Sequence, residues 1–206
     1  YTAYDAGTGA IVKTITDVDT SRTSEFQSLP AGWSTRAGGG LHLVTAFEVD
    51  YLGRTTKTTD PRGNVTYTVY NDVGRETRTY VGWNATTRRT TGPIQVSRKD
   101  SSGTYTETLT FAGTPATNAA GRPSGTEAIT NLQSLTRSIV NSAGQLIAVD
   151  RYTNLASLAY TTNATLGAEG TNYLRTRYAY DNHAQVDRVQ SPAGTITHSI
   201  YDGSIR

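Results

Sequence analysis

Cysteine and methionine are absent from this 206-residue sequence, and only three residues are phenylalanine. Without cysteine, the fold has no disulfide to stabilise it and no thiolate to bind a metal. The lack of both sulfur-containing residues suits a protein exposed to oxidants at a surface. No apolar run reaches the roughly 18 residues that a membrane-spanning helix needs. We therefore expect no membrane span.

A strong net charge is also missing. The formal net charge is +2, and the basic residues are scattered, with Arg88-Arg89 and Arg98-Lys99 the only adjacent pairs. A nucleic-acid-binding protein usually gathers its basic residues into a patch or stripe. The sequence thus weighs against a nucleic-acid partner.

What the sequence does contain is an internal repeat. Residues 61–75 align without a gap with residues 192–206. The matched pairs are Pro61 with Pro192, Gly63 with Gly194, Tyr70 with Tyr201 and Arg75 with Arg206. Residues of the same kind at the same spacing indicate one supersecondary unit used more than once.

The repeat predicts a strand followed by a turn. Val65, Tyr67 and Val69 alternate with hydroxyl-bearing residues, and this period of two places an apolar face on one side of a strand. Asn71 can accept a backbone hydrogen bond, and we expect Gly74 to supply the positive φ that closes the loop. A second turn contains Pro61 and Gly63. Since a lone hairpin cannot bury its apolar face, stacked neighbours should cover it.

The rest of the chain fits the same all-β architecture, which we expect to be repeated antiparallel β-hairpins stacked into a solenoid-like or spiralling sheet. Residues 94–98 and 104–111 predict a long hairpin, with Tyr105, Leu109 and Phe111 on one face. Residues 128–140 could form a helix, but their serine and threonine content favours a strand. We expect residues 20–40 to form a longer excursion. Residues 1–206 should form a single body that is part of a longer or tandemly repeated chain.

Tyrosine–aspartate and glycine–arginine pairs recur with a spacing near 21 residues. In this pattern the sequence resembles the RHS/YD-repeat family. The residues that carry the resemblance are Tyr4, Asp5, Asp50, Gly53, Arg54, Tyr70, Asn71, Gly74, Arg75, Tyr180, Asp181, Tyr201 and Asp202. The resemblance implies a long sheet of hairpins that spirals in one direction, in secreted or cell-surface proteins such as RHS toxins, toxin cocoons and teneurins. Asp60-Pro61-Arg62-Gly63 is similar to an element of the family's self-cleaving core, but its alignment with Ser191-Pro192-Ala193-Gly194 favours an ordinary turn.

No catalytic or metal-binding pattern stands out. The three histidines (His42, His183 and His198) are far apart in sequence, without the spacing of metal ligands. Asp17 and Asp19 lack the remaining ligands of a calcium loop, and Gly38–Gly40 lacks the Lys-Ser/Thr of a phosphate loop. We expect a protein that is not an enzyme and has no cofactor.

Hydroxyl groups are the most abundant polar feature of the strands. If Val65 and Tyr67 face inward, then Thr66, Thr68, Thr197 and Ser199 line the outer face, and they are the candidates for O-glycosylation. Most such residues in proteins are simply solvated strand residues.

The sequence favours a structural role outside the cell. We expect a repeat segment of a secreted or cell-surface fibre or wall, whose partners are copies of itself or adjoining repeats joined by edge-to-edge β pairing, and which carries glycans. One alternative is a wall segment of a toxin-encapsulating shell. A second is a glycan or receptor recognition module that uses Trp33 and Trp83, although each Trp is more often a packing residue.

Overall fold

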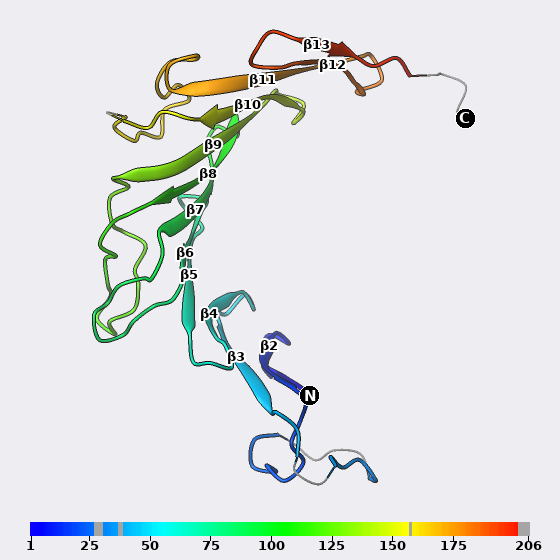
Figure 1. Ribbon diagram of the computed structural model, residues 1–206, viewed down its shortest axis with the longest axis vertical. Coiled ribbons are helices and arrows are strands. Elements are labelled where there is room, and N and C mark those ends of the chain that lie inside the picture. Colours follow the sequence, from blue (N-terminus) through cyan, green and yellow to red (C-terminus); the bar gives the residue numbers. More distant parts are fainter. Residues whose placement is uncertain (27–30, 37–38, 157, 202–206) are drawn as a thin grey trace. The chain divides into compact units, whose positions relative to one another are not determined.

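The computed structural model describes residues 1–26, 31–36, 39–156 and 158–201. Within these ranges the regular structure consists entirely of strands (Figure 1). The strands are β1 (Thr2–Tyr4), β2 (Ile11–Thr16), β3 (Leu43–Val49), β4 (Thr55–Thr59), β5 (Val65–Asn71), β6 (Glu76–Tyr80), β7 (Ile94–Lys99), β8 (Tyr105–Phe111), β9 (Leu132–Val140), β10 (Leu146–Tyr152), β11 (Tyr173–Tyr180), β12 (Val186–Gln190) and β13 (Ile196–His198).

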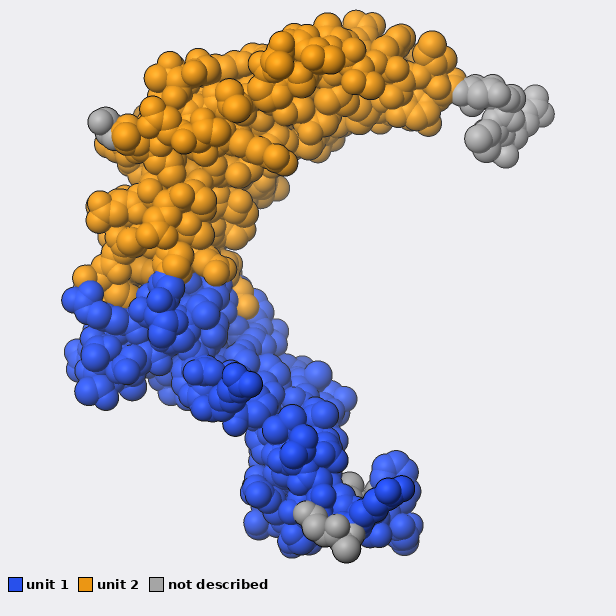
Figure 2. Space-filling view, viewed as in Figure 1, with its two compact units in different colours: residues 1–69, 79–92, 117–124 blue, residues 70–78, 93–116, 125–206 orange. Residues whose placement is uncertain are grey.

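These strands form one open antiparallel sheet, in which each strand lies beside its neighbours in the sequence. The prediction of an all-β fold built from antiparallel hairpins is confirmed. Two compact units divide the chain (Figure 2): residues 1–69, 79–92 and 117–124 make up unit 1, and residues 70–78, 93–116 and 125–206 make up unit 2. A solenoid or spiral, and a single body within a longer chain, stay predictions.

Several local predictions match the strands. β7 and β8 form the expected long hairpin, in register from Ile94 opposite Phe111 to Lys99 opposite Thr106. Residues 132–140 form a strand and no helix. The excursion predicted over residues 20–40 is irregular where the structure describes it, and its positions 27–30 and 37–38 lie outside the described residues.

Around β8 in unit 2, one face of the sheet is buried and the other is exposed to solvent. Along β8, Tyr105, Glu107, Leu109 and Phe111 are buried, while Thr106 and Thr108 between them are exposed. This is the period-two pattern of a strand with one covered face. The outward, hydroxyl-rich face predicted from the sequence is therefore present on β8.

Long connections between hairpins provide the cover, and this differs from the cover by stacked neighbours expected from the sequence. Residues 160–164 of the β10–β11 connection lie against β7, β8 and β9 through contacts with Arg98, Tyr105 and Arg137. In unit 1, Trp83 of the β6–β7 connection packs on Tyr67 of β5 at 6.0 Å between ring centroids. The single layer of strands is thus covered on one side by irregular connections of the same chain.

Among the described residues, none belongs to a helix that is long and apolar enough to cross a membrane.

Candidate functional site

The repeat motif forms a closed loop at the end of a hairpin. The Oδ1 atom of Asp50 accepts hydrogen bonds from the backbone N–H groups of Leu52 and Arg54, both at 2.9 Å. The N–H of Gly53 donates to the Asp50 carbonyl at 2.9 Å, and Gly53 has a φ of +77°, which glycine adopts without strain. The Arg54 guanidinium donates from Nε to Asp50 Oδ2 at 2.8 Å. The Gly-Arg pair therefore closes the loop by backbone and side chain together.

The same backbone geometry recurs along the chain. In each loop the first residue donates its N–H to the carbonyl of the fifth, and the fourth donates its N–H to the carbonyl of the first. The loops are residues 50–54, 60–64, 118–122, 141–145, 181–185 and 191–195. The fourth position has a positive φ in every one of them. The loop of the Gly-Arg motif at residues 50–54 and the Pro-Gly loop at residues 60–64 therefore share one geometry.

The hairpins differ in the strand that follows the loop. After the 50–54, 141–145 and 181–185 loops, the register shifts so that one extra residue bulges from the return strand. After the 60–64 and 191–195 loops, the strands pair without a shift. A bulge increases the local twist and re-aims a side chain. The two kinds of hairpin thus differ in the pairing of their strands, although their loops have the same geometry.

Asp60-Pro61-Arg62-Gly63 lies within one of these loops, as the turn interpretation predicted. Asp60 Oδ1 accepts the N–H groups of Arg62 and Asn64, and Asn64 Nδ2 donates to Asp60 Oδ2 at 2.7 Å. The hydrogen bonds from Asn64 hold the pKa of Asp60 below its ordinary value of 3.8. All of the polar atoms named here are engaged in loop formation.

The tyrosines of the motif connect neighbouring hairpins. Tyr180 ends β11 and donates its hydroxyl to the carbonyl of Leu146, the first residue of β10, at 2.8 Å. Tyr201 donates to the carbonyl of Val186, the first residue of β12, also at 2.8 Å. Each carbonyl directly follows an aspartate or asparagine loop. A later tyrosine therefore secures the turn of an earlier hairpin.

The loop at residues 71–75 departs from the predicted geometry. Asn71 Oδ1 accepts the Gly74 N–H at 2.9 Å, but it is Arg75 that takes a positive φ, of +48°. A Cβ on Gly74 would lie 2.7 Å from Asn71 Nδ2, so a larger residue there would displace the Asn71 side chain. Assigning the positive φ to Gly74 was wrong. β6 begins directly after Arg75, at Glu76.

The remaining motif residues have varied settings. Tyr4 is exposed at the end of β1, and Asp5 Oδ2 accepts the N–H groups of Gly7 and Thr8 in a longer loop. Asp181 forms the standard loop, with Ala184 at its fourth position. Asp202 lies outside the described residues.

The four candidate hydroxyls divide between the two units. Thr66 and Thr68 are half-buried in β5, while Thr197 in β13 and Ser199 beyond it are exposed. Their O-glycosylation stays a prediction. Among the candidate platforms, Trp83 is 7% exposed and packs edge-on against Tyr80 and Tyr67, so it is a packing residue. Trp33 is 70% exposed.

A row of charged side chains that the sequence did not reveal lies on the covered face of unit 2. Residues that pair directly across antiparallel strands carry their side chains on the same face. The register pairs each member of this row with the next, from β7 to β11. In order, the row is Arg98, Glu107, Arg137, Asp150 and Arg175.

Glu107 is the buried anion at the centre of the row. It is 1% exposed, and its carboxylate contacts Arg98 Nη2 at 2.7 Å and Arg137 Nε at 2.9 Å. The Tyr160 hydroxyl, from the covering connection, donates to the same carboxylate. Burial, followed by the hydrogen bond to Glu107, raises the pKa of Tyr160 above its ordinary value, which keeps the hydroxyl protonated as a donor.

Arg137 ties the covering connection to the sheet. It is 0% exposed, and with Nε bound to Glu107 its terminal nitrogens donate to backbone carbonyls. The acceptors are Thr161 at 2.9 Å, Asn163 at 2.6 Å and Ala164 at 3.3 Å. Tyr152 adds a hydrogen bond to the carbonyl of Leu166 at 2.8 Å, and burial raises its pKa to about 12.

A second buried arginine in unit 2 makes the same two kinds of contact as Arg137. Arg78, 8% exposed, binds the Glu76 carboxylate through Nε at 2.5 Å. Its Nη1 donates to the carbonyl of Glu127 at 2.7 Å and to the Glu127 carboxylate at 2.9 Å. In both cases an arginine neutralised by a strand glutamate uses its remaining donors on an irregular connection.

The placement of side chains that can hold metal ions is a further feature of the described part of the chain. There, no group of three histidine, cysteine, aspartate or glutamate side chains is placed to hold a metal ion. His42 is buried in the β2–β3 connection, where its Nδ1 accepts the Asp19 N–H at 3.0 Å. His198 is exposed in β13.

Comparison with family models and with curated proteins finds no match for this chain.

The fourth position of the loop gives a matched pair of substitutions. Gly144 has a φ of +80° with nothing near its missing Cβ, whereas Ala184 holds a φ of +62° at the equivalent place. We expect Gly144→Ala to lower the free energy of unfolding by about 1 kcal/mol, and Ala184→Gly to raise it by about 0.5 kcal/mol, because only the alanine pays the left-handed strain. Urea unfolding of both variants checks this. Effects of the same sign would contradict a shared geometry.

The buried pair predicts a large loss of stability from a small change. Glu107→Gln keeps the shape of the side chain but leaves the Arg137 charge buried without its anion, and we expect it to cost about 3 kcal/mol or more. Glu169→Gln is the matched control, because Glu169 pairs with Arg177 at 2.6 Å with both side chains about 40% exposed. That change should cost less than about 1 kcal/mol. Equal losses in thermal or denaturant unfolding would show that burial of the pair is unimportant.

Proposed function

We propose that this chain is a structural repeat segment of a YD-repeat protein, one that builds an extracellular fibre or wall by pairing the edges of its sheet with adjoining repeats. In this proposal the sheet continues into neighbouring repeats and spirals, as the family resemblance implies. The single observation that carries the proposal is the open sheet of hairpins with closed, repeated loops. Such a sheet can be extended at its edge strands, which present unpaired N–H and C=O groups.

The outward groups of the edge strands follow from the register. In β13, Ser199 donates its N–H to Asp187 of the neighbouring segment, and Thr197 pairs with Val189. Because antiparallel residues alternate between facing their partner and facing away, the His198 N–H points to the open side. The edge strand β1 is similar. Tyr1 and Ile15 exchange hydrogen bonds, so the Thr2 N–H points outward.

The way in which the sheet faces are covered also supports the proposal of a segment that pairs through its edges. In unit 2 the chain's own connection covers β7 to β9, so an adjoining repeat is needed only at the edges and over the uncovered strands β10 to β13. The solvent-exposed face is hydroxyl-rich, which supports the proposal that glycans are attached there. A wall segment of a toxin-encapsulating shell would use the same edge pairing and is the alternative within the family.

Proline substitution in an edge strand tests the proposed edge-to-edge pairing without disrupting the sheet within the chain. Proline is tolerated in an edge strand where its missing N–H would have faced solvent. We expect the wild-type chain to associate end to end as its concentration rises, and His198→Pro or Thr2→Pro to suppress this without a change in melting temperature. His198→Ala keeps the N–H and should associate normally. Sedimentation velocity and negative-stain electron microscopy would measure association, and monomers of the wild-type chain at every concentration would refute the proposal.

Glycosylation is tested on material from the native source. We expect an intact mass above that of the bare polypeptide, with the added sugars mapped to exposed hydroxyls such as Thr197 and Ser199. A mass equal to the polypeptide alone rules out the glycan part of the proposal and leaves the structural part standing.

A further inference from the structure

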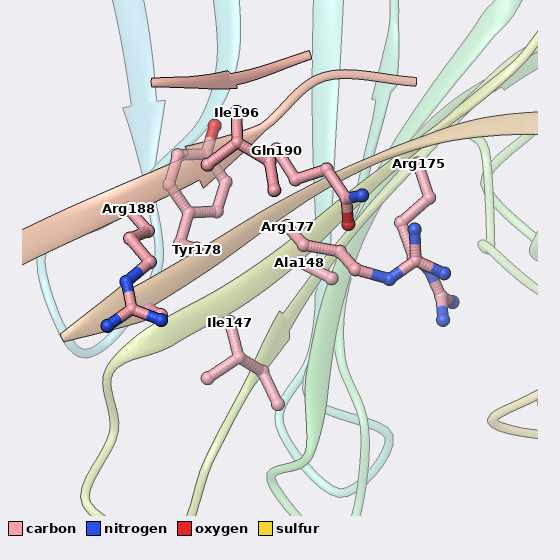
Figure 3. Close-up of a pocket in the computed structure, with 9 residues that line it drawn as sticks. Ile147, Ala148, Arg175, Arg177, Tyr178, Arg188, Gln190 and Ile196 are labelled. Carbon is pink, nitrogen blue, oxygen red and sulfur yellow. The ribbon is translucent and has the colours of Figure 1, made fainter. Parts of the chain in front are cut away.

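A groove lies on unit 2 where the covered face of the sheet continues past its covering connection. It has a volume of about 450 Å³ and is formed by β10, β11, β12 and β13. Its lining includes Arg175, Arg177, Arg188, Gln190, Ile147 and Ile196. Figure 3 shows the arginines Arg175 and Arg177 toward one end and Arg188 toward the other, with the isoleucines between them.

The register places the groove on the same face as the charged row. Ala148 pairs with Arg177, Arg177 with Gln190, and Gln190 with Ile196, so these four side chains form the next row along the strands. Ala148 and Asp150 both belong to the covered face of β10, since both are buried. The groove is therefore continuous with the surface that residues 160–164 cover on β7 to β9.

A bulge supplies the apolar floor. The register of β9 and β10 shifts between Leu146 and Ala148, which makes Ile147 the extra residue. A bulged residue is rotated out of the normal alternation, so Ile147 lines the groove beside Ala148. Ile196, which is 62% exposed, lines the groove from β13.

The arginines of the groove are neutralised in the manner of Arg137. Arg175 makes two hydrogen bonds to the Asp150 carboxylate, at 2.6 and 2.7 Å. Arg177 donates from Nη2 to Glu169 at 2.6 Å, and Arg188 lies 3.5 Å from Asp187. A guanidinium carries five N–H donors, so donors remain after each of these contacts. With its charge balanced, such a surface suits neutral carbonyl oxygens better than a polyanion.

Covering segments on this sheet come from later in the chain than the strands they cover. Residues 160–164 cover β7 to β9, and Glu127 covers Arg78 of β6. In unit 1, the Trp83 ring packs on the Tyr67 ring of β5 at 6.0 Å between centroids. The connection after β12 is the tight loop 191–195, too short to reach back over the groove.

We propose that this groove binds an extended, uncharged polypeptide segment of the same kind as the chain's own covering connections, with arginine donors on its backbone carbonyls and separate aliphatic side chains against Ile147 and Ile196. The proposal goes beyond edge-to-edge assembly, because a peptide on the sheet face leaves the edges of β1 and β13 open. The two can fail independently.

The probe is a copy of the segment that Arg137 binds. An acetylated and amidated peptide with the sequence of residues 158–166 is titrated into the ¹⁵N-labelled full chain to about 2 mM, which detects dissociation constants near the millimolar range. We expect shifts confined to β10–β13, and little change when salt is raised. Arg177→Ala should weaken binding about tenfold. Arg151→Ala, on the opposite face of β10, should change it less than about twofold.

The outcomes separate the alternatives. No shifts, or shifts centred on β7–β9 where the peptide would replace residues 158–166 of the chain itself, overturn the proposal. A heparin fragment that binds the groove tightly and loses affinity steeply with salt, while the peptide does not bind, assigns the groove to an anionic polysaccharide and also overturns it. Melting temperatures of the two variants confirm that each remains folded.

Discussion

A hydrogen bond from a buried arginine to the carbonyl of an irregular connection is the contact on which the covered face of unit 2 depends. A sheet of one layer has no second sheet or helix to cover its apolar side, so the chain uses its connections. Irregular backbone brings carbonyls that have no partner of their own, and burying them without one would cost stability. Arg137 reaches Thr161, Asn163 and Ala164 from the sheet, and this makes the cover possible.

That solution requires a charge in the core, and the neighbouring strand balances it. Glu107 neutralises Arg137 on one side and Arg98 on the other, and Tyr160 completes its hydrogen bonding from the cover. The core therefore contains charged residues as well as apolar ones, which is consistent with a hydrophobic content of only 35%. Its stability depends on the pairing of these charges, because a half-satisfied buried network costs more than an apolar one.

The loops and the covering contacts differ in how far the sequence predicts them. A loop such as 141–145 is complete within five residues. Asn141 accepts two N–H groups, and Gly144 supplies the left-handed φ, so local residue types are enough to predict it. Local rules have limits even there, because Ala184 occupies the glycine position and Arg75 takes the φ expected of Gly74. The row from Arg98 to Arg175 was not predictable, because it exists only once the register of five strands is known. The alternation in β8 does place Glu107 on the same face as Tyr105 and Leu109, but the sequence does not show which charged residues of the neighbouring strands lie opposite it.

The contacts that complete each part of the sheet come from residues that follow it in the chain. Tyr180 secures the turn before β10 and Tyr201 the turn before β12, and residues 160–164 cover strands that were made before them. A hairpin of this protein is thus closed at its loop by its own residues. Its buried face and the carbonyl that follows its loop are contacted by residues that come later in the chain. Local closure needs little loop entropy, and the later contacts span only the next one or two hairpins. The same dependence gives the repeat its direction: each unit is finished by its successor, so a β-hairpin array of this kind can be lengthened at its carboxyl-terminal side without disturbing what is already formed.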